Sequence, residues 1–341
     1  GRAGPRRRTH PWQAAAHPDE TVDGMSLFPD ARLHVVTGKG GTGTTTIASA
    51  LALALAAGGK RVLLAEVEGR QGLARLFDAP ALTYDERRIA RAAEGGEVSA
   101  IAIDPEPALV DYLAMFYRAG VAGGIMRRLG LVEFATTIAP GIRDVLLTGK
   151  VREATDRRRS TGVPVYDAVV LDAPPTGRIG RFLGVTEQLS SLTRTGPIRR
   201  HADTVAALLR SKATAVHLVT LLEDMPVQET LDAAAELAGH VHLGAVFVNQ
   251  SLPPAADDAS GVPSLQRVRQ SLAAAGVQEP GLASALLTLA QDRKAQHTRQ
   301  ADLQARLAQT GLPVLPLPAI TDAAELSGVY ELSDRLREEW R

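Results

Sequence analysis

The stretch Val35–Ala50 reads VVTGKGGTGTTTIASA, and it decides the fold. A short β-branched run ends at Gly38, glycines recur as far as Gly43, and helix-forming residues follow from Thr44. A strand, a glycine-rich loop and a helix in this order bind anions, because the main-chain N–H groups of the loop and the positive end of the helix converge on one place. We therefore predict a nucleotide phosphate site. Its expected contacts are Gly38, Gly40, Gly41, Thr42, Gly43, Thr44, Thr45 and Thr46.

The loop departs at one position from the phosphate-binding pattern G-x-x-x-x-G-K-[ST], because Thr44 replaces the lysine. Thr45 stands where the Mg²⁺-binding hydroxyl belongs, and Mg²⁺ needs few protein ligands because it keeps several waters. Loss of a preorganised cationic donor costs on the order of 10²–10³ in rate. We expect ATP or ADP to bind more weakly and hydrolysis to be slow or absent. Lys39 lies too early in the loop to replace the missing charge within the same chain.

A dinucleotide site is the competing interpretation of the loop. Three of its glycines also fit G-x-G-x-x-G, and Glu66 lies where a ribose-binding acid would end the second strand. The stretch YDAVVLDAPPTGR, residues 166–178, favours a nucleoside triphosphate instead, because an apolar strand ends there in Asp172 and a Pro- and Gly-rich loop follows. In phosphoryl-transfer sites such an Asp holds Mg²⁺ directly or through water, and the loop after it senses the γ-phosphate.

The composition excludes several classes of protein. The 341 residues include 45% hydrophobic side chains and no cysteine, and their formal net charge is zero. This excludes disulfides, Cys-zinc sites and thiol nucleophiles, gives no global attraction to nucleic acid, and suits a cytoplasmic protein. No apolar run approaches the roughly 20 residues of a membrane span. We expect residues 1–30 to be a disordered tail, with Met25 as a candidate native start and a basic binding arm as the alternative.

Apolar runs alternate with helical patterns along the rest of the chain. Most runs are continuous, which is typical of strands covered on both faces. We predict an α/β fold with a doubly wound, mainly parallel sheet in one domain over residues 31–341, with helical insertions at about 105–150 and 187–212. Further helices are expected at 282–309 and at 323–340, the latter packed on the domain. The expected strands are Leu33–Thr37, Val62–Val67, Val98–Ile103, Tyr166–Leu171, Ala215–Leu221, Leu243–Asn249 and Val314–Leu317.

The loop GKGGTGTTT resembles the deviant phosphate loop of the ArsA and tail-anchored-protein-targeting ATPases, which are relatives of MinD and ParA in the SIMIBI class of P-loop proteins. The stretch LDAPPTGRIGRFL, residues 171–183, is similar to their switch II and is more specific than the loop. Further likenesses follow in order to about residue 335 and point to the bacterial ArsA-like anion-transporting ATPases. They are TLLEDMPVQETLDAAAEL, GAVFVNQ and LPVLPLPAITDAAEL.

The resemblance implies roles that spacing alone does not assign. In this family the early lysine, here Lys39, reaches across a dimer interface to the partner's nucleotide, while Asn249 would read adenine and Pro318 would belong to the closing adenine loop. The segment EVEGRQGLARLFD, residues 66–78, corresponds to switch I. Glu68 falls there at the position of the catalytic aspartate that orients water, in place of an Asp-Pro-Ala-His run. Its extra methylene would misplace the carboxylate.

A cross-reaching Lys39 implies a dimer, because we expect this lysine to have no target within its own chain. A heterodimer with an ArsA-like paralogue is preferred to a homodimer, since a partner with an intact site would tolerate the loss of the lysine at Thr44. Two other accounts of Thr44 stay open. In the first, Thr44 is an engineered replacement that traps a bound state. In the second, the site binds no nucleotide and the fold has only a structural role.

The first helical insertion carries apolar residues at helical spacing, and they are Leu109, Leu113, Phe116, Met126, Leu129 and Phe134. In the targeting ATPases a similar helical layer forms a groove for an apolar client helix. The alternative, which we prefer, is that these side chains pack on the sheet or on the dimer mate.

Overall fold

The computed structural model of this chain describes residues 28–67, 69–116, 140–184, 197–252, 262–320 and 325–339. The strands in this part of the chain are β1 Leu33–Gly38, β2 Arg61–Val67, β3 Arg87–Arg91, β4 Glu97–Ile103, β5 Ala168–Asp172, β6 Thr214–Thr220, β7 Leu243–Ser251 and β8 Val314–Pro318. They form an eight-stranded sheet in the order β3-β4-β2-β5-β1-β6-β7-β8. The first strand therefore lies in the interior of the sheet, beside β5 and β6.

Neighbouring strands among those described pair in parallel, except that β3 and β4 are antiparallel. Every residue of β1, β5 and β6 is buried. Burial on both faces explains why these strands are continuous apolar runs in the sequence. The prediction of an α/β fold with a mainly parallel sheet is confirmed.

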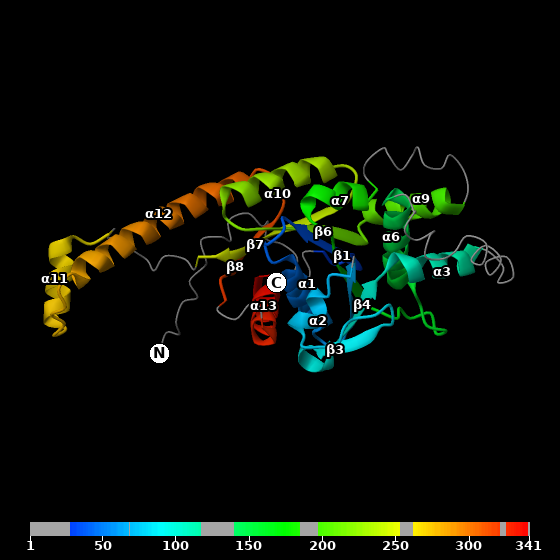
Figure 1. The fold of residues 1–341 in the computed structure, drawn as a ribbon, viewed down its shortest axis with the longest axis horizontal. Helices are drawn as coiled ribbons and strands as arrows, with labels where there is room; N and C mark the ends of the chain where they lie inside the picture. The colour runs from blue at the N-terminus through cyan, green and yellow to red at the C-terminus, as the bar shows by residue number, and fades with distance from the viewer. Residues whose placement is uncertain are drawn as a thin grey trace, which may run out of the picture.

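Helices cover both faces of the sheet (Figure 1). The first face carries α1 Thr44–Ala56, α2 Gly72–Leu76 and α13 Leu326–Glu339, and the second carries α6 Pro140–Asp156, α7 Thr176–Phe182, α9 Pro197–Arg210 and α10 Asp224–Leu237. The other helices are α3 Pro105–Phe116, α11 Leu265–Ala274 and α12 Leu282–Ala308, and a short 3-10 turn spans Ala93–Gly95. Right-handed crossovers from parallel strands produce this two-sided arrangement.

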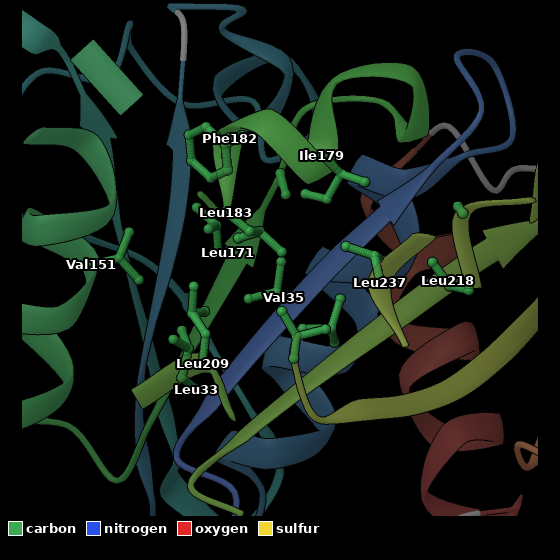
Figure 2. Close-up of a cluster of buried hydrophobic side chains, with 14 of the residues drawn as sticks. Leu33, Val35, Val151, Leu171, Ile179, Phe182, Leu183, Leu209, Leu218 and Leu237 are labelled. Carbon is green, nitrogen blue, oxygen red and sulfur yellow. The ribbon is translucent and has the colours of Figure 1, made fainter. Parts of the chain in front are cut away.

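Figure 2 shows the apolar core on the second face of the sheet. Val35 of β1 and Leu171 of β5 meet Ile179 and Phe182 of α7 and Leu237 of α10, and each of these side chains is buried. Burying a side chain of this size stabilises a fold by about 1.5–3 kcal/mol. Helix α7 and the loop before it are thereby anchored to the strands that carry the predicted site.

The structure differs from the sequence-based prediction at one edge of the sheet. Strand β3 was not expected, because its residues RRIAR contain three arginines and no continuous apolar run. The charged side chains suit an edge strand, because they discourage other chains from pairing with its unpaired N–H and C=O groups. The expected strands are otherwise present within one or two residues of their predicted ends.

The helical insertions are described only in part. Residues 117–139, between α3 and α6, lie outside the described residues. Residues 185–196, which precede α9, also lie outside them. Of the apolar side chains expected to form a client groove, Leu109 is 6% exposed and packs inward. The side chains of Leu113, Phe116, Met126, Leu129 and Phe134 lie outside the described part, and so does the predicted tail over residues 1–27.

Helices α11 and α12 form an arm that extends away from the sheet (Figure 1). Only Ala283, Leu303 and Leu307 of α12 are buried, and no residue of α11 is buried. By contrast, α13 is packed on α1 through Val329, Leu332 and Leu336, as expected for the C-terminal helix. A search of the described helices for a segment long and apolar enough to cross a membrane finds none.

Candidate functional site

The glycine-rich loop joins the end of β1 at Gly38 to the start of α1 at Thr44. Gly41 and Gly43 have φ angles of 93° and 87°, in the left-handed region that favours glycine. A Cβ on Gly38 would lie 2.3 Å from the main-chain oxygen of Val219 on β6, so this position also requires glycine. Thr42 closes the loop, because its Oγ1 donates a hydrogen bond of 2.8 Å to the main-chain oxygen of Lys39.

Two side chains that could hold Mg²⁺ meet beside the glycine-rich loop. Thr45 Oγ1, in the first turn of α1, donates a hydrogen bond of 2.7 Å to Asp172 Oδ2 at the end of β5. Asp172 is 1% exposed, and its other oxygen, Oδ1, is buried without a hydrogen-bond partner. Burial raises the pKa of the Asp172 carboxyl, whereas Arg70 and the hydrogen bond from Thr45 act in the opposite direction.

This pair fits the metal that the family resemblance implies. A hydroxyl and a carboxylate are ligands that Mg²⁺ accepts, and a metal ion or its bound water would satisfy the orphaned Oδ1. A cluster of three or more potential His, Asp or Glu ligands is absent from the described residues. The donor set therefore suits an ion that keeps most of its waters rather than one caged by protein.

The segment predicted as switch II begins directly after Asp172, and a hydrogen bond joins it to β1. Thr37 Oγ1 on β1 donates a hydrogen bond of 2.6 Å to the main-chain oxygen of Pro174. Thr176, the first residue of α7, is 5% exposed, and its Oγ1 is buried without a partner. A hydroxyl in this state is available to a ligand that binds at the end of β5.

The segment predicted as switch I starts from Glu66, which is completely buried on β2 beside Asp172. Its carboxylate accepts hydrogen bonds from the N–H groups of Gln71 (2.8 Å) and Leu73 (3.1 Å), at the start of α2. Glu66 is therefore a structural cap of switch I and does not present its carboxylate to a ribose, which removes the main support for a dinucleotide site. Glu68, the predicted water-orienting residue, lies outside the described residues.

Arg70, in the segment predicted as switch I, contacts the candidate site, and the sequence-based prediction assigned it no role. Its Nη2 donates hydrogen bonds to the main-chain oxygens of Asp172 (2.9 Å) and Ala173 (3.2 Å) and lies 3.5 Å from Asp172 Oδ2. Its Nε is buried without a partner. The available signal was the departure from the Asp-Pro-Ala-His run, because that departure places an arginine in the segment predicted as switch I.

Lys39 has a partner within its own chain, contrary to our expectation. Its ammonium group forms an ion pair with the carboxylate of Glu229 on α10, and the two side chains are 30% and 37% exposed. The expectation failed because the two residues are 190 positions apart in the sequence and are brought together by the sheet. The predicted contact of Lys39 with a partner's nucleotide across a dimer interface stays a prediction.

The two predicted adenine-site residues lie at the carboxyl ends of their strands, as the loop does at the end of β1. Asn249, near the end of β7, donates a hydrogen bond of 2.9 Å from Nδ2 to the main-chain oxygen of Thr42 and accepts one of 2.9 Å at Oδ1 from the N–H of Gln250. Its amide thus supports the phosphate loop in this structure. Pro318 ends β8 and pairs in register with Ser251 of β7.

Comparison with known proteins agrees with this geometry. Residues 31–202 match the family model described as Anion-transporting ATPase. The chain is 52% identical over 327 residues to ATPase BagA of Mycobacterium tuberculosis, an alignment that covers 94% of this chain and 96% of the relative. It shows the same identity and the same coverage with the protein named "Putative ATPase Mb3704" of Mycobacterium bovis.

Proposed function

The chain belongs to the ArsA type of anion-transporting ATPases, and from this premise we propose that it is an ATP-binding subunit of a dimeric switch whose hydrolysis is impaired by Thr44. The observation that carries the proposal is the meeting of Thr45 with Asp172 next to the glycine loop, with Asp172 Oδ1 left unsatisfied. Buried polar atoms are nearly always hydrogen bonded, so an orphaned carboxylate oxygen at this place points to a site for a metal ion or its bound water.

Each part of the site has a defined task in this proposal. The N–H groups of the loop from Gly38 to Gly43 and the start of α1 bind the phosphates, as helix N-termini do. Thr45 and Asp172 would hold Mg²⁺, which neutralises charge that develops on the phosphates. Thr176 lies at the start of α7, where switch II would sense the terminal phosphate.

Thr44 is the reason why we expect turnover to be slow. A hydroxyl can donate one hydrogen bond to a phosphate oxygen, but it carries no charge, and a charged donor contributes roughly twice as much as a neutral one. The loop amides and the metal ligands are unaffected by the replacement, so nucleotide binding should persist while the transition state loses stabilisation. Glu68, one methylene longer than the family's aspartate, should add to the loss.

We further propose that the subunit works as a dimer in the cytoplasm, preferably with an ArsA-like paralogue that keeps its lysine. The support is the position of Lys39 on the loop, where its partial exposure would let it exchange Glu229 for a group on a partner. An exposed ion pair of this kind is worth only about 0–1 kcal/mol, so little energy holds the lysine in its present position.

The test is calorimetric titration of the purified chain with ATP and with ADP in the presence of Mg²⁺, together with a turnover assay before and after Thr44→Lys. We expect measurable binding, turnover near background for the unsubstituted chain, and a rise of turnover in the variant. Rapid hydrolysis by the unsubstituted chain would refute the impaired site.

A second candidate function is a scaffold subunit that binds no nucleotide and acts only through its partner. The internal pairing of Lys39 with Glu229 and of Asn249 with the loop supports this candidate, because both residues already have partners without a ligand. Complete absence of binding in the titration, combined with a stable heterodimer, would favour the scaffold over the switch.

A further inference from the structure

We propose that Arg70 supplies, from switch I, the positive charge toward the terminal phosphate of ATP that the phosphate loop lacks at Thr44. The inference rests on the proposed function, because it requires a nucleoside triphosphate in the site. It goes beyond that function by assigning the γ-phosphate contact to a residue that the resemblance gives no role.

The first argument is position. The guanidinium of Arg70 lies against the end of β5, where Nη2 contacts two main-chain oxygens of switch II and is 3.5 Å from Asp172 Oδ2. The same carboxylate oxygen accepts the 2.7 Å hydrogen bond of Thr45, which directly follows Thr44. Asp172 Oδ2 therefore connects Arg70 to the start of α1, where the phosphate-binding pattern has its lysine.

The second argument is the set of unsatisfied atoms around this arginine. Four buried side-chain nitrogen or oxygen atoms in the described part of the chain have no hydrogen-bond partner, and three of them belong to Arg70, Asp172 and Thr176. They are a donor (Nε), an acceptor (Oδ1) and a hydroxyl (Oγ1). A phosphate oxygen accepts from Nε and from the hydroxyl, and a metal-bound water donates to Oδ1, so a magnesium-bound phosphate would satisfy all three.

The third argument is that hydrogen bonds hold the main chain next to Arg70 firmly, while its side chain stays partly exposed. Glu66 accepts the N–H of Gln71 at 2.8 Å, and the Gln71 side chain both donates to and accepts from the main chain of Leu82, at 3.0 and 2.8 Å. The Arg70 side chain is 32% exposed. An arginine held at its base with its planar fork at the site edge is well suited to bind phosphate.

The last argument is charge. Glu66 and Asp172 are neighbours in the register of β2 and β5, so two buried carboxylates lie side by side. Among the described residues, Arg70 is the cation that lies within ion-pair distance of Asp172. With Mg²⁺ and ATP bound, Arg70 exchanges the Asp172 carboxylate for a phosphate oxygen, and both charges remain paired.

The test is a double-mutant cycle on nucleotide affinity. The variants Arg70→Gln, Thr44→Lys and the combination of both are titrated with ADP and with the non-hydrolysable ATP analogue AMP-PNP, each with Mg²⁺. We expect Arg70→Gln to weaken AMP-PNP binding about 10- to 100-fold, as for a charge-assisted contact, and ADP binding by less than about 3-fold. Thr44→Lys should restore most of the AMP-PNP affinity in the Arg70→Gln background.

The matched control is Arg88→Gln on the edge strand β3. Arg88 pairs with Glu97 at 2.7 Å at the surface, so this variant removes the same charge away from the site and should leave both affinities unchanged. If Arg70→Gln unfolds in a thermal melt, Arg70→Lys replaces it. This variant keeps a charge and should retain the preference for AMP-PNP over ADP within about 10-fold.

Three results would overturn the inference, and they differ in what else they overturn. Equal loss of ADP and AMP-PNP affinity would mean that Arg70 only holds switch II in place. Unchanged AMP-PNP affinity, or no restoration by Thr44→Lys, would reject the charge replacement but leave the proposed function intact. Failure of the unsubstituted chain to bind either nucleotide would overturn both proposals.

Discussion

A buried pair of histidines under the site makes the stability of this chain dependent on pH. His34 of β1 and His217 of β6 are stacked with ring centroids 5.4 Å apart, and His34 Nδ1 lies 3.1 Å from His217 Nε2. The N–H of Ala245 donates to His217 Nδ1 at 3.1 Å, so that nitrogen carries no proton and His217 Nε2–H donates to His34. Both rings are therefore neutral in the folded chain.

The magnitude follows from the pKa values. Burial lowers the pKa of His34 from 6.5 to about 4, and it lowers the pKa of His217 as well. Between pH 4 and pH 6.5 the unfolded chain binds more protons than the folded chain. The contribution of the neutral histidine to the free energy of unfolding is therefore fully present above pH 6.5 and falls as the pH drops toward 4. For His34 alone, a fall from pH 7 to pH 5 should lower the free energy of unfolding by about 2 kcal/mol.

The assay is urea unfolding at pH 7 and at pH 5 for the unsubstituted chain, His34→Gln and the exposed control His240→Gln. The amide of Gln at position 34 keeps an acceptor for His217 but does not titrate. We expect its loss of unfolding free energy between the two pH values to be smaller by about 2 kcal/mol, and the control to behave like the unsubstituted chain. An equal loss in all three proteins would refute the assignment of the acid sensitivity to this pair.

Three further perturbations test the site. Asp172→Asn should abolish the Mg²⁺-dependent part of nucleotide affinity without lowering the melting temperature, because it removes a desolvated carboxylate; titration with and without EDTA measures this. Gly43→Ala should destabilise the chain by about 1–3 kcal/mol and weaken nucleotide binding, since its φ is 87° and the new Cβ would lie 2.4 Å from Asn249 Nδ2; thermal melts and the same titration check it. Glu229→Gln should raise the dimer fraction in analytical ultracentrifugation with ATP, because Lys39 is released from its ion pair, at a stability cost under about 1 kcal/mol. An unchanged dimer fraction would show that Lys39 does not promote dimerisation.

The sequence predicted the parts of the fold that depend on local pattern. Strands β1, β5 and β6 are wholly buried, and strands covered on both faces are mostly apolar along their length, so their pattern is readable without a structure. Strand β3 is half exposed and rich in arginine, and such a pattern does not differ from that of a loop. The helix over 282–308 was also predicted, but its extension from the sheet was not, because periodicity gives the apolar face of a helix and not its partner.

The candidate site was predictable where one segment sufficed and not where two distant segments meet. The glycine loop with Thr45 could be located from spacing, and Asp172 from the end of an apolar strand. The roles of Glu66, Lys39 and Arg70 depend on contacts between separate loops. Glu66 has the same sequence context as a ribose-binding acid, and only the turn into α2 makes its carboxylate a cap.

The location of the positive charge decides what kind of switch this chain would be. A lysine at position 44 would belong to the loop that β1 and α1 hold at both ends. Arg70 belongs to switch I, and its side chain contacts the main chain of switch II at Asp172 and Ala173. If this arginine turns to a terminal phosphate, it must release those two oxygens, so binding of triphosphate would uncouple the two switches, whereas diphosphate would leave them joined. A chain of this design would respond to the loss of the γ-phosphate even when it cannot catalyse that loss itself, which is the behaviour that a subunit paired with an active partner requires.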